Sequence, residues 1–169
     1  ATSTGNVAGA PPGRDGIDYL TAALNAIAGI AGFAQLEKIL IVADNDGSPP
    51  DALQRVQQKI NGTAIFQQNR RYIAPAQEQV TTGANPSITI LMLPWSGQPG
   101  ALDTLCLTAA RNKEPAIGAC VDAFAACVST AGWPPPREDK MKLRALISAA
   151  YGDPYISPAW VWRDGTDLV

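Results

Sequence analysis

The feature that most constrains the fold is an apolar stretch that runs directly into acidic residues. Residues 39–43 read Ile-Leu-Ile-Val-Ala, and Asp44, Asn45, Asp46 and Gly47 follow. An apolar run without alternation is typical of a strand that is buried on both faces of a parallel sheet. Because unpaired carboxylates are costly to bury, we expect Asp44 and Asp46 at the solvated end of this strand or beside a positive charge.

A second apolar stretch, residues 87–93, is predicted to be another central strand. A helix is expected between the two strands, over residues 49–61, because Pro49 suits a first helical turn and Ser48 with Asp51 resembles a capping box. Helical spacing of apolar residues predicts further helices over 17–30, 101–112, 115–132 and 137–152. This order of strands and helices favours one α/β domain over residues 15–169 after a flexible segment, residues 1–14.

The composition excludes several kinds of chemistry. The chain has 169 residues and no histidine, which removes histidine bases, triads and metal ligands. A net charge of −2 offers no basic field that would hold nucleic acid by electrostatics alone. The basic residues singled out for contact with nucleic acid are Arg14, Arg70 and Arg71.

Three cysteines without metal-type spacing fit a reducing cytosol better than a disulfide scaffold. Cys120 and Cys127 are seven residues apart on an apolar helix, so they should share one face, and we expect them to be buried. No charged segment followed by an apolar core opens the sequence, and no clean run of about 20 apolar residues occurs. We therefore expect a cytoplasmic protein with no membrane segment.

Three aspartates are expected to meet at one edge of the sheet. Ligands of parallel sheets bind outside the carboxyl ends of the strands. Asp44 and Asp46 follow one such end, and Asp103 opens the helix that follows the loop at 94–100. Converging carboxylates repel one another, and Mg²⁺ or Mn²⁺ bound to their oxygens would relieve this repulsion. The alternative is that these aspartates only stabilise turns and a helix start.

A metal held in this way would suit phosphoryl transfer. Two ions about 3.5–4 Å apart can activate a water molecule and stabilise a leaving oxygen. Lys140, near the start of the last predicted helix, could neutralise charge that develops on the phosphate. Asp44, Asp46, Asp103 and Lys140 are therefore the candidate catalytic residues.

Four segments of the chain resemble a known family: ILIVADNDGSPPDALQRVQQKI, ITILMLPWSGQPGALDTLCL, CVDAFAAC and KMKLRALISAAYGDP. Together they are similar to stand-alone Toprim-like proteins, which are related to the Toprim domain of OLD-type (overcoming lysogenization defect) nucleases. The resemblance spans about Gly13 to Pro154. It implies a three-layer sandwich in which helices flank a central, mostly parallel sheet, and a Mg²⁺-type acidic site.

By position, the resemblance implies that Asp44 and Asp46 match the paired aspartates of the family and that Lys140 matches a late lysine. Asp103 stands where relatives usually have glutamate. The family also has a glutamate at the end of its first strand, and the acidic residues before Asp44 are Asp15, Asp18 and Glu37, none of which is well placed. Both an active nuclease-type site and a degenerate one stay open.

Two other classes of protein remain as alternatives. The stretch ILIVADNDGS also resembles the first motif of haloacid-dehalogenase-like phosphohydrolases, in which Asp44 would be the nucleophile, Asp46 the acid/base and Ser96 a phosphate-binding residue. The second acidic pair of that family is not found. The other alternative is a non-catalytic Toprim-like binding module or partner protein, with an interface around Trp133, Trp160 and Trp162.

Overall fold

The computed structural model describes residues 16–64, 73–95 and 97–155. The chain divides into two compact units, one that ends at Gly97 and one that begins at Gln98. The segment predicted to be flexible, residues 1–14, lies outside the described residues. A single domain over residues 15–169 stays a prediction.

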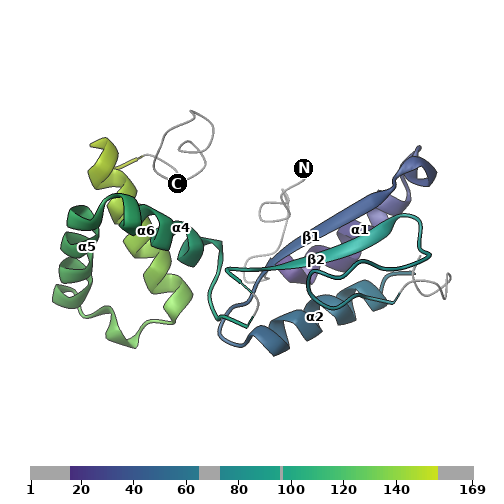
Figure 1. Ribbon diagram of the computed structural model, residues 1–169, viewed down its shortest axis with the longest axis horizontal. Helices are drawn as coiled ribbons and strands as arrows, with labels where there is room; N and C mark the ends of the chain where they lie inside the picture. Colours follow the sequence, from purple (N-terminus) through teal and green to yellow (C-terminus); the bar gives the residue numbers. More distant parts are fainter. Residues whose placement is uncertain (1–15, 65–72, 96, 156–169) are drawn as a thin grey trace. The chain divides into compact units, whose positions relative to one another are not determined.

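The first unit is an α/β unit with two strands, as the sequence predicts (Figure 1). β1 pairs with β2 in parallel, with Lys38 opposite Ser87 and Asp44 opposite Leu93. The elements in chain order are η2 (Gly16–Tyr19), α1 (Leu20–Ala28), η3 (Phe33–Gln35), β1 (Lys38–Asp44), α2 (Pro49–Asn61) and β2 (Ser87–Leu93). The predicted parallel pairing of these two strands is confirmed.

The core of this unit lies on one face of the sheet. Ile41 of β1 and Ile90 of β2 are register partners, and both are buried in a cluster with Leu24 of α1 and Val56 of α2. Because both helices contribute to the same cluster, they cover the same face of the sheet. A three-layer arrangement with helices on both faces therefore stays a prediction.

The prediction that β1 is buried on both faces is wrong. Burial alternates along the strand, and Leu40 and Val42 are 62% and 51% exposed. Since successive side chains of a strand point to opposite faces, only every second residue of β1 reaches the core under α1 and α2. β2 differs from β1, because four of its seven residues are buried and the others are half-buried.

The start of α2 follows the sequence pattern with one difference. Pro49 occupies the first turn, and the backbone N–H of Ala52 donates to the carbonyl of Ser48 at 2.9 Å. The Ser48 hydroxyl donates to the Asp51 carboxylate at 2.7 Å instead of capping a backbone N–H. The helix therefore begins where the proline and serine predict, without the reciprocal capping box.

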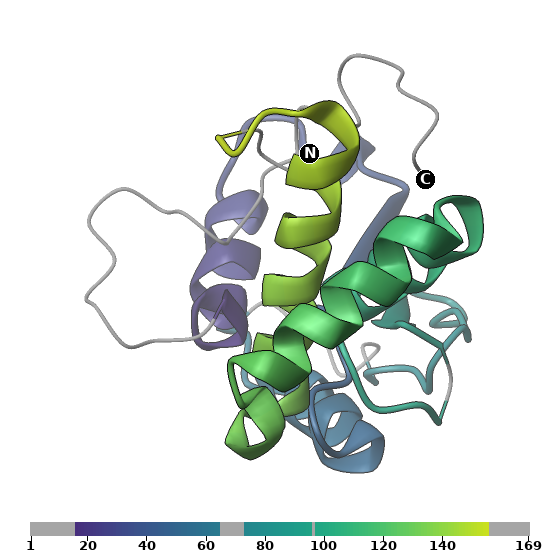
Figure 2. The ribbon, with the colours of Figure 1, turned by 90° about the vertical axis from the view of Figure 1, so that its left-hand side faces the viewer.

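The second unit is helical. Its elements are α4 (Leu102–Lys113), α5 (Pro115–Cys127), η4 (Thr130–Gly132) and α6 (Pro135–Tyr151), and both ribbon views show these helices together (Figures 1 and 2). The helices predicted in this region are confirmed. The one exception is the helix predicted over residues 115–132, which is shorter than expected. α5 ends at Cys127, and Ser129 has a left-handed backbone with φ of 58°. None of the described helices is long and apolar enough to cross a membrane.

The cysteine prediction holds only in part. Cys106 of α4 is buried in the core of the second unit, where it joins Leu107, Leu143 and Leu146. Cys120 and Cys127 are exposed, so their predicted burial is wrong. The buried positions of α5 are Gly118, Val121 and Ala125, and the two cysteines fall on the other side of that helix.

Candidate functional site

The acidic turn after β1, residues 44–47, is hydrogen-bonded to the end of β2 and to the residues that follow it. Asn45 is fully buried, its backbone N–H donates to the carbonyl of Leu93 at 2.8 Å, and its side-chain amide donates to the carbonyl of Trp95 at 2.8 Å. These bonds hold the carboxyl ends of the two strands together at one edge of the sheet, as the sequence predicts for parallel neighbours. Sequence reasoning did not assign Asn45 this positioning role.

Asp44 and Asp46 flank this buried asparagine, and both are exposed. Asp44 is the last residue of β1 and follows Leu40 and Val42 on the exposed face of the strand. Asp46 has a left-handed backbone with φ of 50°, a conformation that aspartate tolerates better than most residues. The turn therefore presents two carboxylates to solvent on either side of an anchored residue.

Asp46 also has a positive neighbour. The Nη1 atom of Arg55, on α2, lies 3.8 Å from Oδ2 of Asp46, and the two side chains are 45% and 55% exposed. Exposed ion pairs of this kind contribute about 0–1 kcal/mol to stability. Both sequence expectations for this carboxylate, a solvated position and a positive charge, are therefore met.

Asp103 and Lys140 belong to the second unit, and the structure brings these two predicted residues together. Asp103 lies in the first turn of α4, and Nζ of Lys140 on α6 is 3.8 Å from its Oδ2 atom. Asp44 and Asp46 belong to the first unit. The convergence of three carboxylates on one cation therefore stays a prediction.

At the start of α4, the local structure is stabilised by hydrogen bonds of Thr104. The Thr104 hydroxyl accepts the backbone N–H of Ala101 at 3.1 Å and donates to the Asp139 carboxylate at 2.6 Å. Gly100, with φ of 133°, lies so close that a Cβ atom there would be 2.7 Å from the Thr104 hydroxyl. Asp103 is thus held on a helix end that is fixed by other residues.

The donor set of the acidic turn suits a hard cation. Among the residues that the structure describes, no group of three or more Asp, Glu, Cys or His side chains could hold a metal ion. Mg²⁺ is often bound by one or two carboxylates and completes its shell with water and substrate phosphates. Asp44 and Asp46 fit this mode of binding, whereas a closed all-protein site would need more ligands.

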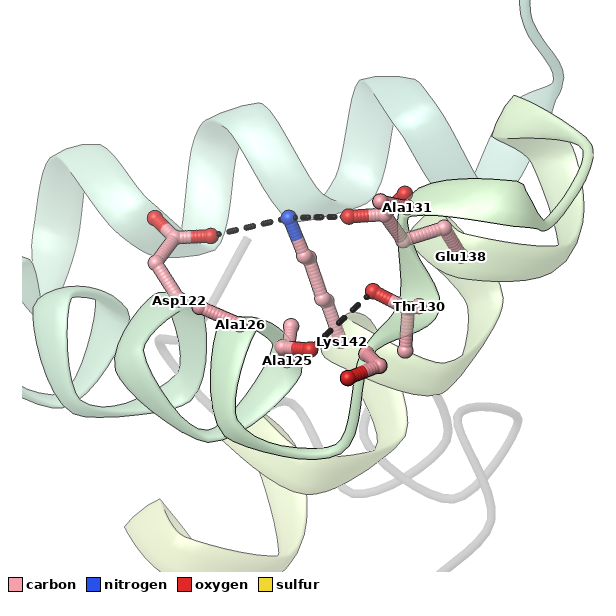
Figure 3. A pocket seen from close by; sticks show the side chains of 8 residues that line it. Asp122, Ala125, Ala126, Thr130, Ala131, Glu138 and Lys142 are labelled. Atoms are coloured by element: carbon pink, nitrogen blue, oxygen red, sulfur yellow. Dashed lines mark hydrogen bonds and ion pairs between the residues drawn. The ribbon is translucent and has the colours of Figure 1, made fainter.

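A pocket of about 190 Å³ in the second unit contains none of the predicted residues (Figure 3). Lys142 of α6 reaches Glu138 at 2.6 Å and Asp122 of α5 at 3.1 Å, and Arg111 also donates to Asp122. The hydrogen bond from Lys142 lowers the pKa of Glu138, and the same bond raises the pKa of Lys142. The i,i+4 spacing of Glu138 and Lys142 could have revealed this pair in the sequence.

The buried thiol is not suited to nucleophilic chemistry. Burial, followed by the nearby negative charge of Asp103, raises the pKa of Cys106. The thiol therefore stays protonated at neutral pH and acts as a small apolar side chain of the core.

Several residues named in the alternative hypotheses lie outside the described part of the chain. These residues are Arg14, Arg70, Arg71, Ser96, Trp160 and Trp162. Trp133 is half-buried, and the guanidinium of Arg137 lies 4.3 Å from the centre of its ring. Trp133 is therefore partly covered by its own helical unit, and a role in an interface stays a prediction.

Comparisons with known proteins add no relative. No family model, no curated protein and no solved structure matches this chain.

Proposed function

We propose that this chain is a Toprim-like protein that binds Mg²⁺ or Mn²⁺ through Asp44 and Asp46 and uses the ion in phosphodiester chemistry on nucleic acid. The observation that carries the proposal is the turn after β1, where buried Asn45 holds two exposed carboxylates at the carboxyl end of a parallel strand. Asp103 is proposed as the third carboxylate. A three-layer Toprim-like sandwich is part of the same proposal.

The residues divide into two roles. Asp44, Asp46 and Asp103 supply oxygen ligands, and Lys140 supplies a positive charge for the phosphate oxygens. When bound, the cation supplies a Lewis acid for a phosphoryl oxygen. The 3.8 Å contact between Lys140 and Asp103 supports a shared role, because it keeps the lysine within reach of a proposed ligand.

The charge of the chain supports a substrate that binds through the metal. With a net charge of −2, the protein attracts nucleic acid only weakly by its own field. Phosphate oxygens would instead fill the coordination positions that two or three carboxylates leave open. We therefore expect nucleic-acid binding to depend on the divalent cation.

The experiment is a cleavage assay on labelled single- and double-stranded DNA and RNA with Mg²⁺ or Mn²⁺. We expect cleavage that stops on addition of EDTA and falls by about 100-fold or more in Asp44→Asn and in Asp46→Asn. Glu37→Gln is the matched control, since this exposed carboxylate precedes the opposite end of β1. Equal activity in the wild type and both aspartate variants would overturn the proposal.

The binding module is retained as a second candidate because the described residues of the first unit offer two carboxylates at this turn. It predicts cation-dependent retention of nucleic acid or of a protein partner, without cleavage of any of the four substrates. Hydrolysis of a generic aryl phosphate, with a covalent intermediate on Asp44, would instead favour the haloacid-dehalogenase-like alternative.

A further inference from the structure

An exposed tryptophan follows the end of β2, beside the acidic turn. Trp95 is 56% exposed. Trp133, the other tryptophan that the structure describes, is half-buried and has the guanidinium of Arg137 over its ring. Exposure of one apolar side chain is ordinary, so what distinguishes Trp95 is where its backbone is held.

The backbone of Trp95 is held against the acidic turn. Its carbonyl accepts a hydrogen bond from the side-chain amide of fully buried Asn45 at 2.8 Å. Pro94, the residue before it, is also buried. Leu93, at the end of β2, is the register partner of Asp44. The indole is therefore attached to a fixed point at the same edge of the sheet as the two carboxylates.

The distance from this point to the carboxylates is short on the scale of a nucleotide chain. Asn45 separates Asp44 from Asp46 in the sequence, and consecutive Cα atoms are about 3.8 Å apart. Trp95 is one hydrogen bond away from Asn45. A phosphate group held by a cation at these carboxylates would therefore have a base of the same strand within reach of the indole.

We propose that Trp95 stacks on a base of a single-stranded nucleic acid whose phosphate is bound at the acidic turn. This inference rests on the proposed function and adds the substrate class, an unpaired strand of DNA or RNA. Aromatic side chains are platforms on which bases stack without regard to sequence. In a duplex each base is already paired and stacked on its neighbours, so an indole gains this contact only with an unpaired or displaced base.

The charge of the chain makes a stacking contact important for affinity. Proteins that bind single strands combine stacking with a positive groove that follows the backbone. This chain has a net charge of −2, so a cation at the turn supplies the attraction for the phosphate and the indole supplies the contact with the base. Binding is therefore expected to need both the divalent cation and the aromatic ring.

The test is fluorescence anisotropy of the whole chain with labelled DNA and RNA strands of about 12 nucleotides, each as a single strand and as a duplex. Mg²⁺ is present, and low temperature slows cleavage. We expect the wild type to bind single strands more tightly than duplexes. Trp95→Ala should raise the dissociation constant for single strands about tenfold and remove this preference, whereas Trp95→Phe keeps an aromatic ring and most of the affinity.

An abasic strand is the matched ligand control, because it keeps the phosphates and sugars and lacks the bases. The wild type and Trp95→Ala should bind it equally. Ile30→Ala is the matched protein control, since Ile30 is 59% exposed and lies between α1 and the opposite end of β1. This variant should bind every strand as the wild type does. Far-UV circular dichroism of each variant checks that lost binding is not a lost fold.

Equal affinity of the wild type and Trp95→Ala for single strands would overturn the inference, as would a wild type that binds no strand. An equal loss of affinity for the abasic strand would also overturn it, because the ring would then act without a base. Weaker binding in Asp44→Asn alongside unchanged binding in Trp95→Ala would leave the proposed metal site in place. Weaker binding in Trp95→Ala that is the same in EDTA would instead keep the stacking contact and count against the metal site, so the two failures are distinguishable.

Discussion

Asn45 is the residue on which the geometry of the acidic turn depends. It is fully buried between two exposed aspartates, and it donates hydrogen bonds to the carbonyl groups of Leu93, the last residue of β2, and of Trp95. A buried amide that loses its partners costs about 1–3 kcal/mol, so this residue holds its place firmly. The carboxylates of Asp44 and Asp46 therefore project from a fixed point instead of a free loop.

Under the proposed function, Arg55 would compete with a bound cation for Asp46. Its guanidinium lies 3.8 Å from the carboxylate, and a positive charge at that distance disfavours a second cation. We predict that Arg55→Gln raises the affinity for Mn²⁺ by a few-fold, since exposed ion pairs contribute up to about 1 kcal/mol. Calorimetric titration measures this change, with Arg137→Gln in the second unit as the control. Unchanged or weaker binding in Arg55→Gln would contradict this role.

Glu138 should make the stability of the protein depend on acid pH. Its pKa is lowered in the folded state by the hydrogen bond from Lys142. A carboxylate with a lowered folded-state pKa stabilises the fold above its unfolded pKa of about 4.3 and loses this contribution as pH falls through the folded pKa. We predict that Glu138→Gln destabilises the protein at pH 7 and that the difference shrinks below about pH 4.

Urea unfolding at a series of pH values measures this effect. Glu114→Gln is the matched control, because Glu114 precedes α5 and does not belong to the pocket of Figure 3. A difference between wild type and Glu138→Gln that stays constant from pH 7 to about pH 3 would show that the ion pair does not contribute in this way.

At the scale of elements, β2 contributes more buried side chains to the core of the first unit than β1 does. Ile88, Ile90 and Met92 are fully buried, and residues 78 and 81 are hydrogen-bonded to the edge of the strand that faces away from β1. β1 contributes fewer buried side chains and borders solvent on one face. Truncation of a buried side chain of β2 should therefore lower the free energy of unfolding more than truncation of an exposed side chain.

We predict that Ile90→Ala lowers the free energy of unfolding by about 2–5 kcal/mol, because Ile90 is fully buried at the centre of β2. The matched control is Ile30→Ala, since Ile30 is 59% exposed and should change stability by less than about 0.5 kcal/mol. Denaturant unfolding of the two variants measures both values. Similar losses in both would contradict the position of this core.

The sequence predicts elements better than it predicts their burial. Helix starts and the parallel strand pair follow from local signals, such as Pro49 and the unbroken apolar runs. The exposure of Leu40 and Val42 could not be predicted, because an all-apolar run carries no alternation that distinguishes its two faces. The exposure of Cys120 and Cys127 likewise depends on which side of α5 meets α4 and α6, which is a tertiary choice.

At the scale of the whole molecule, the four candidate residues belong to two compact units, each with its own core. The sequence correctly predicted that the ends of the two strands share one edge, and it placed Asp44 and Asp46 there. It also named Asp103 and Lys140, which form a pair in the second unit. The anchoring role of Asn45 escaped prediction because a buried amide between two aspartates has no distinct sequence signal.

The central claim is that Asp44 and Asp46 bind a divalent cation. Titration of the chain with Mn²⁺, followed by the loss of the free-ion electron paramagnetic resonance signal, tests it most directly. We predict saturable binding to the wild type and to Glu37→Gln, and binding at least about tenfold weaker in the double variant Asp44→Asn with Asp46→Asn, which keeps side chains that tolerate the left-handed turn. Equal affinity in the double variant and the wild type would contradict the claim.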